Sequence, residues 1–405
     1  MSRYYFSILT EYPKNVISSQ VIEYIEFYDK EGINFSIIFL LRLGEYLKGF
    51  SELSKHKSNI EKKINGKVFF FPSGKKPGSW FNVFISYVIL LIKFRKYKND
   101  EIVLHCRGSV SGLAAEKLKR RRKNITYIYD VRADQAAEYN YYAITKGIPE
   151  KERIANLEKD RQIQIGITKN ASKIFFVSDV LKDRFVRNCN IEVSKTAVIP
   201  CLADHTKFYF NGNLRNKVRK QLKIEDKFVF VYPGGIGYWH YSDTIFEIIG
   251  NLMKELENIY FIILTPSVTE AEKLADEKLV KGKYFIESAE RDEVAGFLNA
   301  ADMGVLLRER DPLNEVAAPT KFAEYVMTGL PVLISDFIGD YSQFVKEKNI
   351  GLVLKEEDTA NSTEIIKEFL LNYNLPSRKE IAETGLANFS KNKYAKIMAE
   401  SYKSI

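Results

Sequence analysis

Short runs of β-branched and aromatic residues alternate with longer stretches of helical periodicity along the whole chain. This alternation is typical of βαβ units, which build parallel sheets covered by helices. In the first half we expect strands at 4–9, 34–40, 67–72, 101–106, 125–131 and 173–178. A second series is expected at 228–233, 260–265, 283–287, 303–307, 331–335 and 351–354.

The strand series restarts after about residue 225, which indicates two domains. The chain has 405 residues, whereas a single core stops growing at roughly 250–300 residues. We expect an α/β fold with two facing Rossmann-like domains, at 1–205 and 206–405. The polar, basic stretch 211–223 is interpreted as the crossover between them. The helical segment 361–402 could pack back on the N-terminal domain and tie the two together.

The composition favours a protein of a reducing compartment. Three scattered cysteines are too few for a disulfide framework or a metal cluster. No apolar stretch reaches the roughly 20 residues that cross a bilayer, and the N-terminus lacks the layout of a signal peptide. We therefore expect a cytoplasmic protein.

The net charge of +9 is concentrated in the first third of the chain. Residues 1–130 hold 23 Lys/Arg against 12 Asp/Glu, a net +11, and residues 131–405 carry a net −2. Such a basic flank suits an anionic phospholipid surface or a nucleic acid. A lysine-rich surface that only contacts solvent is the alternative.

The segment 315–332 contains the most informative motif. Pro319 fits the first turn of a helix, and Gly329 followed by Pro331 ends it. Lys321 and Glu324 are three residues apart, so both can point into one cleft. The free N–H groups of a helix start suit a diphosphate, and a carboxylate one turn later can accept the hydroxyl protons of a ribose. The alternative is a surface ion pair worth about 0.2–0.5 kcal/mol.

Two further features should lie at the same sheet edge as this helix. Arg308 closes the preceding strand, and the glycine-rich turn 234–237 follows the first strand of the C-terminal domain. Glycines such as Gly235 and Gly237 let a ligand approach the backbone closely, although such a turn often makes only a tight corner. Ser242 is expected to cap the next helix.

These residues resemble the retaining GT-B-fold glycosyltransferases of family 4, particularly those that build bacterial surface polysaccharides. The resemblance rests on Pro319 to Tyr325, on Gly329 to Val332, on Val177-Ser178, and on Ile199-Pro200-Cys201 with Asp204. It implies hexosyl transfer from a nucleotide-sugar co-substrate, expected to be UDP-linked, to a glycan or lipid-linked acceptor. No other cofactor is expected. Because an Asp-x-Asp pair is absent, we also expect no metal dependence.

The resemblance also implies roles for individual residues of the C-terminal half. Glu324 would bind the ribose, and Thr320 with Lys321 the phosphates. The first acid of the family's pair is displaced, because Val316 stands eight residues before Glu324 and Glu315 one place earlier. The cationic pair of many members is replaced by Gly235 and the aromatic pair Tyr238-Trp239. Arg308 and Lys321 are then the expected cations for the leaving diphosphate.

In the N-terminal half, His105 and Arg132 each follow a predicted strand. The resemblance implies that they contact the transferred sugar or the acceptor. A structural hydrogen-bonding role for His105, and an ion pair of Arg132 with Asp130 or Asp134, are the alternatives.

The apolar segment 80–92 is flanked by basic residues but is too short, at 13 residues, to span a bilayer. It could lie in the interface of an anionic membrane, on its inner face, or pack as a buried helix against the sheet. The basic run 117–123 fits anionic lipid or nucleic acid equally well.

Other functions are compatible with parts of this pattern. A GT-B-fold epimerase or phosphorylase is one alternative, and a basic nucleic-acid-binding protein is another. No nucleic-acid partner is expected, because no known nucleic-acid module is recognisable and the main motif lies in the near-neutral part of the chain.

Overall fold

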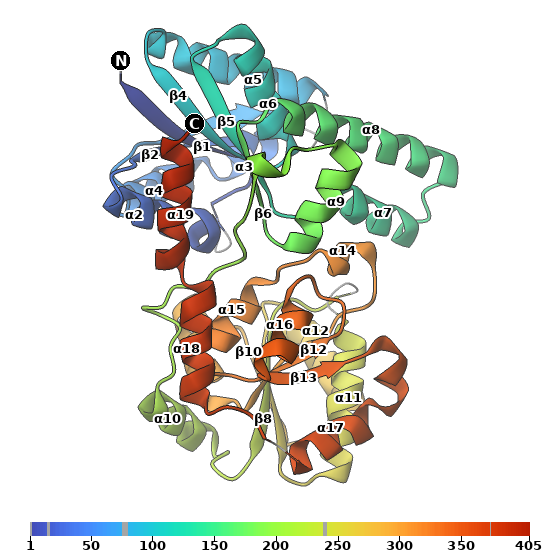
Figure 1. The fold of residues 1–405 in the computed structure, drawn as a ribbon. Coiled ribbons are helices and arrows are strands. Elements are labelled where there is room, and N and C mark those ends of the chain that lie inside the picture. Colours follow the sequence, from blue (N-terminus) through green and yellow to red (C-terminus); the bar gives the residue numbers. More distant parts are fainter. Residues whose placement is uncertain (1, 14–16, 75–79, 238–240, 373) are drawn as a thin grey trace. The chain divides into compact units, whose positions relative to one another are not determined.

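The computed structural model describes residues 2–13, 17–74, 80–237, 241–372 and 374–405. The chain forms two compact units, Met1–Pro200 with Lys391–Ile405, and Cys201–Ser390 (Figure 1). The first unit therefore ends slightly before the expected boundary at residue 205 and includes the C-terminal residues of the chain. Each unit is a parallel sheet flanked by helices, which confirms the predicted GT-B class of two Rossmann-like domains.

The first unit is built on a seven-stranded sheet in the order β3-β2-β1-β4-β5-β6-β7. Its strands are β1 (Arg3–Leu9), β2 (Phe35–Arg42), β3 (Val68–Ser73), β4 (Glu101–Arg107), β5 (Ile125–Val131), β6 (Lys173–Phe176) and β7 (Thr196–Val198). The side chains of β2 from Ile37 to Leu41 are all buried, as expected for a parallel sheet covered on both faces. The strand order reverses between β1 and β4, which makes their carboxyl ends the switch point of this sheet.

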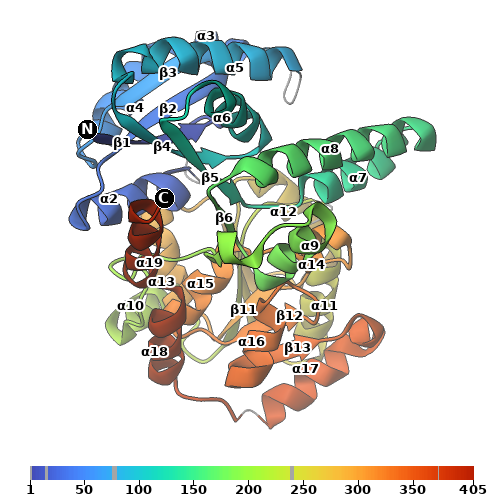
Figure 2. The ribbon, with the colours of Figure 1, turned by 45° about the horizontal axis from the view of Figure 1, so that its top comes forward.

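Helices flank the first sheet. They are α2 (Glu23–Lys30), α3 (Leu43–Lys48), α4 (Phe50–Glu61), α5 (Trp80–Lys93), α6 (Ser109–Arg121), α7 (Gln135–Thr145), α8 (Glu150–Asn170), α9 (Asp179–Cys189) and α19 (Lys391–Lys403). Short helical turns are η1 (Ser18–Ile22), η2 (Phe94–Tyr97) and η3 (Val193–Lys195). Helices α7 and α8 lie side by side as a hairpin (Figure 2).

The last helix, α19, belongs to the core of the first unit although it is remote in sequence. The Lys391 ammonium, which has no exposed surface, pairs with the buried Glu23 carboxylate on α2. The Tyr28 hydroxyl of α2 also lies 2.8 Å from the Met398 sulfur. A buried charge without its partner is costly, so this pair fixes how α19 docks on α2.

The second unit is built on a six-stranded parallel sheet in the order β10-β9-β8-β11-β12-β13. Its strands are β8 (Phe228–Pro233), β9 (Ile259–Leu264), β10 (Tyr284–Glu287), β11 (Met303–Leu306), β12 (Val332–Ser335) and β13 (Gly351–Leu354). The order reverses between β8 and β11, which pair directly through Phe230 and Met303. Their carboxyl ends are the switch point of this sheet.

The helices of the second unit include the two that carry the main sequence motif, α14 (Pro312–Glu315) and α15 (Thr320–Met327). The others are α10 (Gly212–Leu222), α11 (Ser242–Glu255), α12 (Val268–Lys278), α13 (Arg291–Ala300), α16 (Tyr341–Lys348), η5 (Glu356–Asn361), α17 (Ser362–Leu371) and α18 (Arg378–Phe389).

The interpretation of 211–223 as an interdomain crossover was wrong. These residues form α10 inside the second unit, and the Asn211 side chain caps the helix by accepting from the Leu214 N–H. Arg215 and Arg219 both pair with Asp302, at 2.5 and 3.1 Å, so the basic side chains hold α10 on the start of β11. The polar composition serves packing between helix and sheet.

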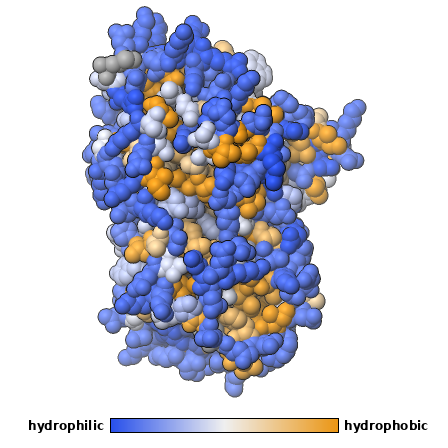
Figure 3. All heavy atoms as spheres, in the orientation of Figure 1, coloured by the Kyte–Doolittle hydropathy of each residue, from blue (hydrophilic) through white to orange (hydrophobic). Residues whose placement is uncertain are grey.

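The surface shown in Figure 3 is largely hydrophilic, with apolar groups scattered over both units. No helix among the described residues is both long and apolar enough to cross a membrane.

Candidate functional site

The switch point of the second sheet brings together three segments singled out by the sequence. The glycine-rich turn 234–237 follows β8, Arg308 follows β11, and α15 begins at Thr320. Ligands of open α/β sheets bind beside such carboxyl ends. We therefore consider this edge the candidate site of the second unit.

Lys321 occupies an aromatic cradle at this edge. Its ammonium nitrogen lies 4.1 Å from the centroid of the Tyr232 ring. A Cβ atom on Gly234 would come within 2.8 Å of the same nitrogen, so a larger residue there would displace the lysine. The Tyr232 hydroxyl donates to the Gly235 carbonyl at 2.8 Å and ties the turn to the strand. The glycine turn therefore accommodates the cation.

The electrostatics of Lys321 are unusual for a lysine. Its pKa is lowered well below the ordinary value, first by burial and then by the positive charge of Arg308, while the Glu324 carboxylate opposes the shift. Burial also lowers the pKa of Arg308. Because the charge of Arg308 disfavours the protonated form of Lys321, a bound anion would relieve the repulsion between the two cations.

Arg308 is held in place by side chains of the following elements. Its guanidinium Nη1 donates to Asn314 Oδ1 at 3.1 Å, and its backbone N–H donates to Ser335 Oγ at 2.9 Å. Asn314 is fully buried and donates in turn to the Glu309 carbonyl at 2.8 Å. The cation is therefore positioned by a buried network that reaches β12.

Glu324 is 7% exposed and pairs with Arg291 of α13 at 3.4 Å. With Lys321 against the Tyr232 ring and Glu324 against Arg291, neither residue matches a solvent-exposed ion pair. A buried carboxylate with a fixed orientation can accept hydrogen bonds from ligand hydroxyl groups.

The remaining donor-site candidates surround this cluster. Glu315 ends α14, and its carbonyl accepts from the Gly339 N–H at 3.1 Å. Thr320 is the first residue of α15. Gly237 has a φ of 147°, which favours glycine, and its N–H donates to Ser242 Oγ at 3.2 Å.

Ser242 does not cap α11, which corrects the expectation from the sequence. Tyr241 occupies the cap position with a φ of 56°, and Ser242 is the first helical residue. The Ser242 hydroxyl instead accepts from the glycine turn. Tyr238 and Trp239 lie outside the described residues.

In the first unit, His105 lies on β4 and is 8% exposed. Its Nε2 lies 3.3 Å from Asp130 Oδ2 on β5, and its Nδ1 lies 2.7 Å from the Tyr402 hydroxyl on α19. Both ring nitrogens are thus engaged inside the unit. This geometry favours the structural alternative for His105, although its contact with a substrate stays a prediction.

Asp130 is the anionic centre of this cluster. Burial would raise its pKa, but the nearby Arg132 charge, the His105 hydrogen bond and the Arg107 charge outweigh burial and lower the pKa to about 2. Arg132 Nη1 lies 3.7 Å from Asp130 Oδ1, which is the ion pair left open by the sequence. Asp134 instead caps α7 and pairs with Arg184 at 3.2 Å.

Sequence reasoning missed several residues of both clusters. Tyr232 and Asn314 were not identified: Tyr232 lies inside the predicted strand 228–233, and Asn314 lies just before the motif that begins at Glu315. Arg291 and Tyr402 had no local signal in the sequence. Arg291 is 33 residues from its partner Glu324, and Tyr402 is 297 residues from its partner His105. Only the tertiary fold brings them together.

Comparisons with known proteins agree with this architecture. Residues 215–386 match the family model described as glycosyl transferases group 1. No curated protein sequence matches significantly.

Solved structures resemble the chain over its whole length. A glycosyltransferase from Rickettsia africae is 15% identical, with 100% of this chain and 99% of that one covered and a TM-score of 0.70. A sucrose-phosphate synthase from Thermosynechococcus elongatus is 15% identical, with 99% of each chain covered and a TM-score of 0.71. HepE from Anabaena, solved in complex with UDP-glucose, is 12% identical, with 99% of this chain and 100% of that one covered and a TM-score of 0.69. At these identities the likeness establishes the fold.

We predict that Asp130→Asn destabilises the first unit at neutral pH by about 2–3 kcal/mol, the linkage value of a carboxyl shifted from about 3.9 to about 2. Because the folded pKa is depressed, this contribution is present above the unfolded pKa and is lost as pH falls from about 4 towards 2. Urea denaturation at pH 7 and pH 3 should show the gap between wild type and variant closing at the lower pH. A gap that does not change with pH would contradict the assignment.

Proposed function

We propose that this chain is a glycosyltransferase that moves a sugar from a nucleotide-sugar donor, UDP-linked, to a glycan or lipid-linked glycan acceptor. The donor binds at the switch point of the second sheet. The observation that carries the proposal is the placement of two cations at one sheet edge: Lys321, on the first turn of α15, lies against the glycine turn, and Arg308 follows β11. The family match over 215–386 covers the same segment of the chain.

The chemistry of sugar transfer explains this arrangement. When the bond between sugar and diphosphate breaks, negative charge grows on the leaving diphosphate. Lys321 and Arg308 lie in partly desolvated positions, where electrostatic stabilisation is stronger than in water. The diphosphate relieves their mutual repulsion, so ligand binding and the growth of negative charge act in the same direction. Thr320 and the first N–H groups of α15 complete the anion site.

Glu324 would set the orientation of the nucleoside. Its carboxylate, paired with Arg291, accepts hydrogen bonds from ribose hydroxyls. Glu315, at the end of α14, is proposed as the displaced first acid of the donor site. Gly235 and Gly237 leave room for the ligand beside the backbone. His105 and Arg132 of the first unit remain candidates for contacts with the transferred sugar or acceptor.

Three finer features belong to the proposal through the resemblance and the sequence. Transfer is of the hexosyl type, it proceeds with retention of configuration, and it requires no metal ion. We assign the enzyme to bacterial surface polysaccharide synthesis in the cytoplasm.

A panel of nucleotide sugars in a thermal-shift assay tests the central claim, because a ligand that binds only the folded state raises the stability of the protein.

Product analysis separates the enzymatic alternatives. A transferase releases UDP only when an acceptor is present, an epimerase isomerises the nucleotide sugar alone, and a phosphorylase consumes phosphate. Steeply salt-dependent binding of DNA or RNA, without any nucleotide-sugar response, would favour the nucleic-acid alternative.

We predict that Glu324→Gln weakens UDP binding about tenfold or more, since a charge-assisted hydrogen bond contributes about 1.5–3 kcal/mol. Isothermal titration with UDP measures the change, and circular dichroism checks the fold. Glu272→Gln, an exposed carboxylate on α12, is the matched control and should bind as wild type. Unchanged affinity in the Glu324 variant would remove the ribose-binding role.

A second prediction follows from the lowered pKa of Lys321. The diphosphate prefers the protonated amine, so UDP affinity should fall as pH rises through that lowered pKa. Lys321→Met should bind UDP more weakly and lose this part of the pH dependence. Titrating both proteins in the same buffers across the pH range below the ordinary lysine pKa cancels the ionisation of the ligand itself. Parallel pH profiles would show that Lys321 does not contact the diphosphate.

We further propose that the first unit docks on the inner face of an anionic membrane. Helix α5 buries Val83, Ser86 and Leu90 but exposes Trp80 at 72%, Phe81 at 55% and Phe84 at 44%. It thus combines both alternatives drawn from the sequence, with one face packed in the unit and one exposed. An exposed aromatic face beside basic residues is typical of interfacial helices.

The lysines near α5 generate a positive field. Burial first, and then the charges of Lys96, Lys57 and Lys67, lower the pKa of Lys93 to about 8. The Lys93 ammonium lies 3.1 Å from the centroid of the Phe69 ring, so it is partly sequestered. The more exposed neighbours are therefore the better candidates for lipid headgroups.

We predict that replacing Trp80, Phe81 and Phe84 together by Ser abolishes co-sedimentation with anionic vesicles at low salt. Replacing Arg95, Lys96 and Lys98 by Ser should weaken binding and its salt dependence, since each basic residue near such a surface contributes about 1 kcal/mol. Ile144 and Ile154 on α7 and α8 are 61% and 54% exposed, and their change to Ser is the matched control. Equal binding to neutral and anionic vesicles, or no binding to either, would refute membrane docking.

A further inference from the structure

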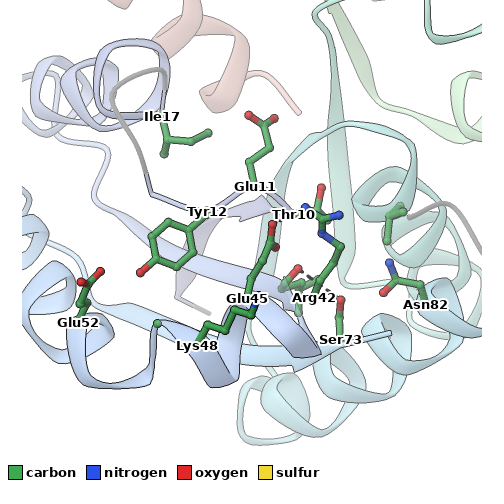
Figure 4. A pocket seen from close by; sticks show the side chains of 13 residues that line it. Thr10, Glu11, Tyr12, Ile17, Arg42, Glu45, Lys48, Glu52, Ser73 and Asn82 are labelled. Atoms are coloured by element: carbon green, nitrogen blue, oxygen red, sulfur yellow. Dashed lines mark hydrogen bonds and ion pairs between the residues drawn. The ribbon is translucent and has the colours of Figure 1, made fainter. Parts of the chain in front are cut away.

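A pocket of about 750 Å³ opens at the carboxyl ends of β1, β2 and β3 in the first unit (Figure 4). Its volume lies within the range of about 300–1,000 Å³ typical of small-molecule sites. Val110, which follows β4, also lines it, so the pocket reaches the switch point of the first sheet. None of the candidate residues from the sequence lines this pocket.

Three carboxylates line the pocket, those of Glu11, Glu45 and Glu52. Glu11 accepts from Arg107 Nε at 3.2 Å, and Glu45 pairs with Arg42. In Figure 4, Tyr12 and Glu52 lie on one side of the pocket, and Ser73 and Asn82 lie on the other. Carboxylate, guanidinium, ammonium, amide and hydroxyl groups thus line one space.

Tyr12 is fitted tightly into this wall. A Cβ atom on Gly49 would come within 2.6 Å of the Tyr12 hydroxyl, although the φ of −92° at Gly49 suits any residue. The absence of a side chain at Gly49 therefore leaves room for the tyrosine. Burial first, and then the Glu52 and Glu45 carboxylates, raise the pKa of Tyr12, which keeps it a neutral phenol able to donate.

The lining discriminates between classes of ligand. Carboxylates only accept hydrogen bonds, so they match the hydroxyl donors of a sugar. Lys48 and Arg42 also line the pocket, but three carboxylates against these two cations leave a net negative lining that disfavours phosphate or carboxylate groups. The adjacent Arg42 and Glu45 offer a donor and an acceptor side by side, which suits neighbouring hydroxyls. Ile17, Leu40 and Val110 supply apolar surface for the ring faces.

We propose that this pocket binds an uncharged, hydroxyl-rich sugar of the acceptor and excludes anionic sugars. The proposal rests on the proposed glycosyltransferase function and names the acceptor's chemistry. It also separates the pocket from the basic surface of the same unit: the lysines around α5 face anionic lipid, whereas the pocket itself takes a neutral group.

The test uses saturation-transfer NMR on the full chain with methyl glycosides of the common neutral hexoses and the corresponding methyl uronides. Wild type should bind at least one neutral glycoside and none of the uronides. Glu45→Gln should weaken neutral binding about tenfold. The double variant Glu45→Gln/Glu52→Gln should gain binding of a uronide. Glu152→Gln, an exposed carboxylate on α8, is the control and should behave as wild type.

A steric pair tests the pocket independently of charge. Gly49→Ala should displace Tyr12 and lower neutral-sugar affinity at least fivefold, whereas Gly44→Ala, where an added Cβ would meet nothing within 4 Å, should change nothing. Equal binding of uronides and neutral glycosides by wild type, no neutral binding at all, or Glu45 and Gly49 variants that bind as wild type would each overturn the proposal.

UDP titration of the same samples keeps the two proposals apart. Pocket variants should retain wild-type UDP affinity in the second unit, and circular dichroism with thermal unfolding checks that their first unit is folded. Sugar binding without any UDP binding would refute the donor assignment and leave the pocket. UDP binding with no sugar selectivity would refute the pocket alone.

Discussion

The repulsion between Lys321 and Arg308 is the constraint around which the second unit is organised. Two cations at a partly buried edge are unfavourable on their own, and burial first and then the charge of Arg308 lower the pKa of Lys321. The surrounding structure holds them there nevertheless. Tyr232 supplies a ring face to one, the buried Asn314 accepts from the other, and Gly234 leaves the space that the ammonium needs. Such an arrangement is stable only because the rest of the fold over-determines it, and it is the physical basis for assigning the anionic ligand to this edge.

The first unit depends on a segment at the other end of the chain. Helix α19 docks through the buried pair of Lys391 and Glu23. Once docked, it brings the Tyr402 hydroxyl to His105, whose other nitrogen meets Asp130. The ring is thereby fixed in orientation by two strands and the last helix. His105 is therefore part of the packing that joins α19 to the sheet, and its contact with a substrate stays a prediction.

Much of the fold could be predicted because its signals are local. Alternation of apolar strands and amphipathic helices predicted the strands of both sheets except the short β7, and the proline and glycine boundaries of α15 predicted that helix closely. The error at 211–223 has a physical cause. Composition cannot distinguish basic side chains that contact solvent from those that form ion pairs inside the fold. Arg215 and Arg219 both pair with Asp302, which lies 83 residues after Arg219 in the sequence.

Only those residues of the candidate donor site that follow directly after a strand, or that belong to the motif at 315–332, could be predicted from the sequence. Residues directly after strands, such as Arg308 and the 234–237 turn, do gather at the switch point, because parallel strands end at one edge. Partners that arrive from other helices, such as Arg291, could not be inferred. Nor could the pocket of the first unit, since Tyr12, Glu45 and Asn82 come from three separate connections with no shared motif.

The two units also show why net charge is a poor guide to the sign of a site. Residues 1–130 carry a net +11, yet the pocket at the carboxyl ends of β1 to β3 is lined by three carboxylates against two cations, Arg42 and Lys48. Residues 131–405 carry a net −2, yet their switch point concentrates two cations. Net charge sums over a surface in which most charges are solvated and screened within about 10 Å at 0.1 M salt, whereas a ligand meets only the few groups within hydrogen-bonding reach. A basic domain is therefore compatible with a neutral ligand. Its long-range positive field can attract an anionic membrane surface, while the local contacts in the pocket bind a sugar.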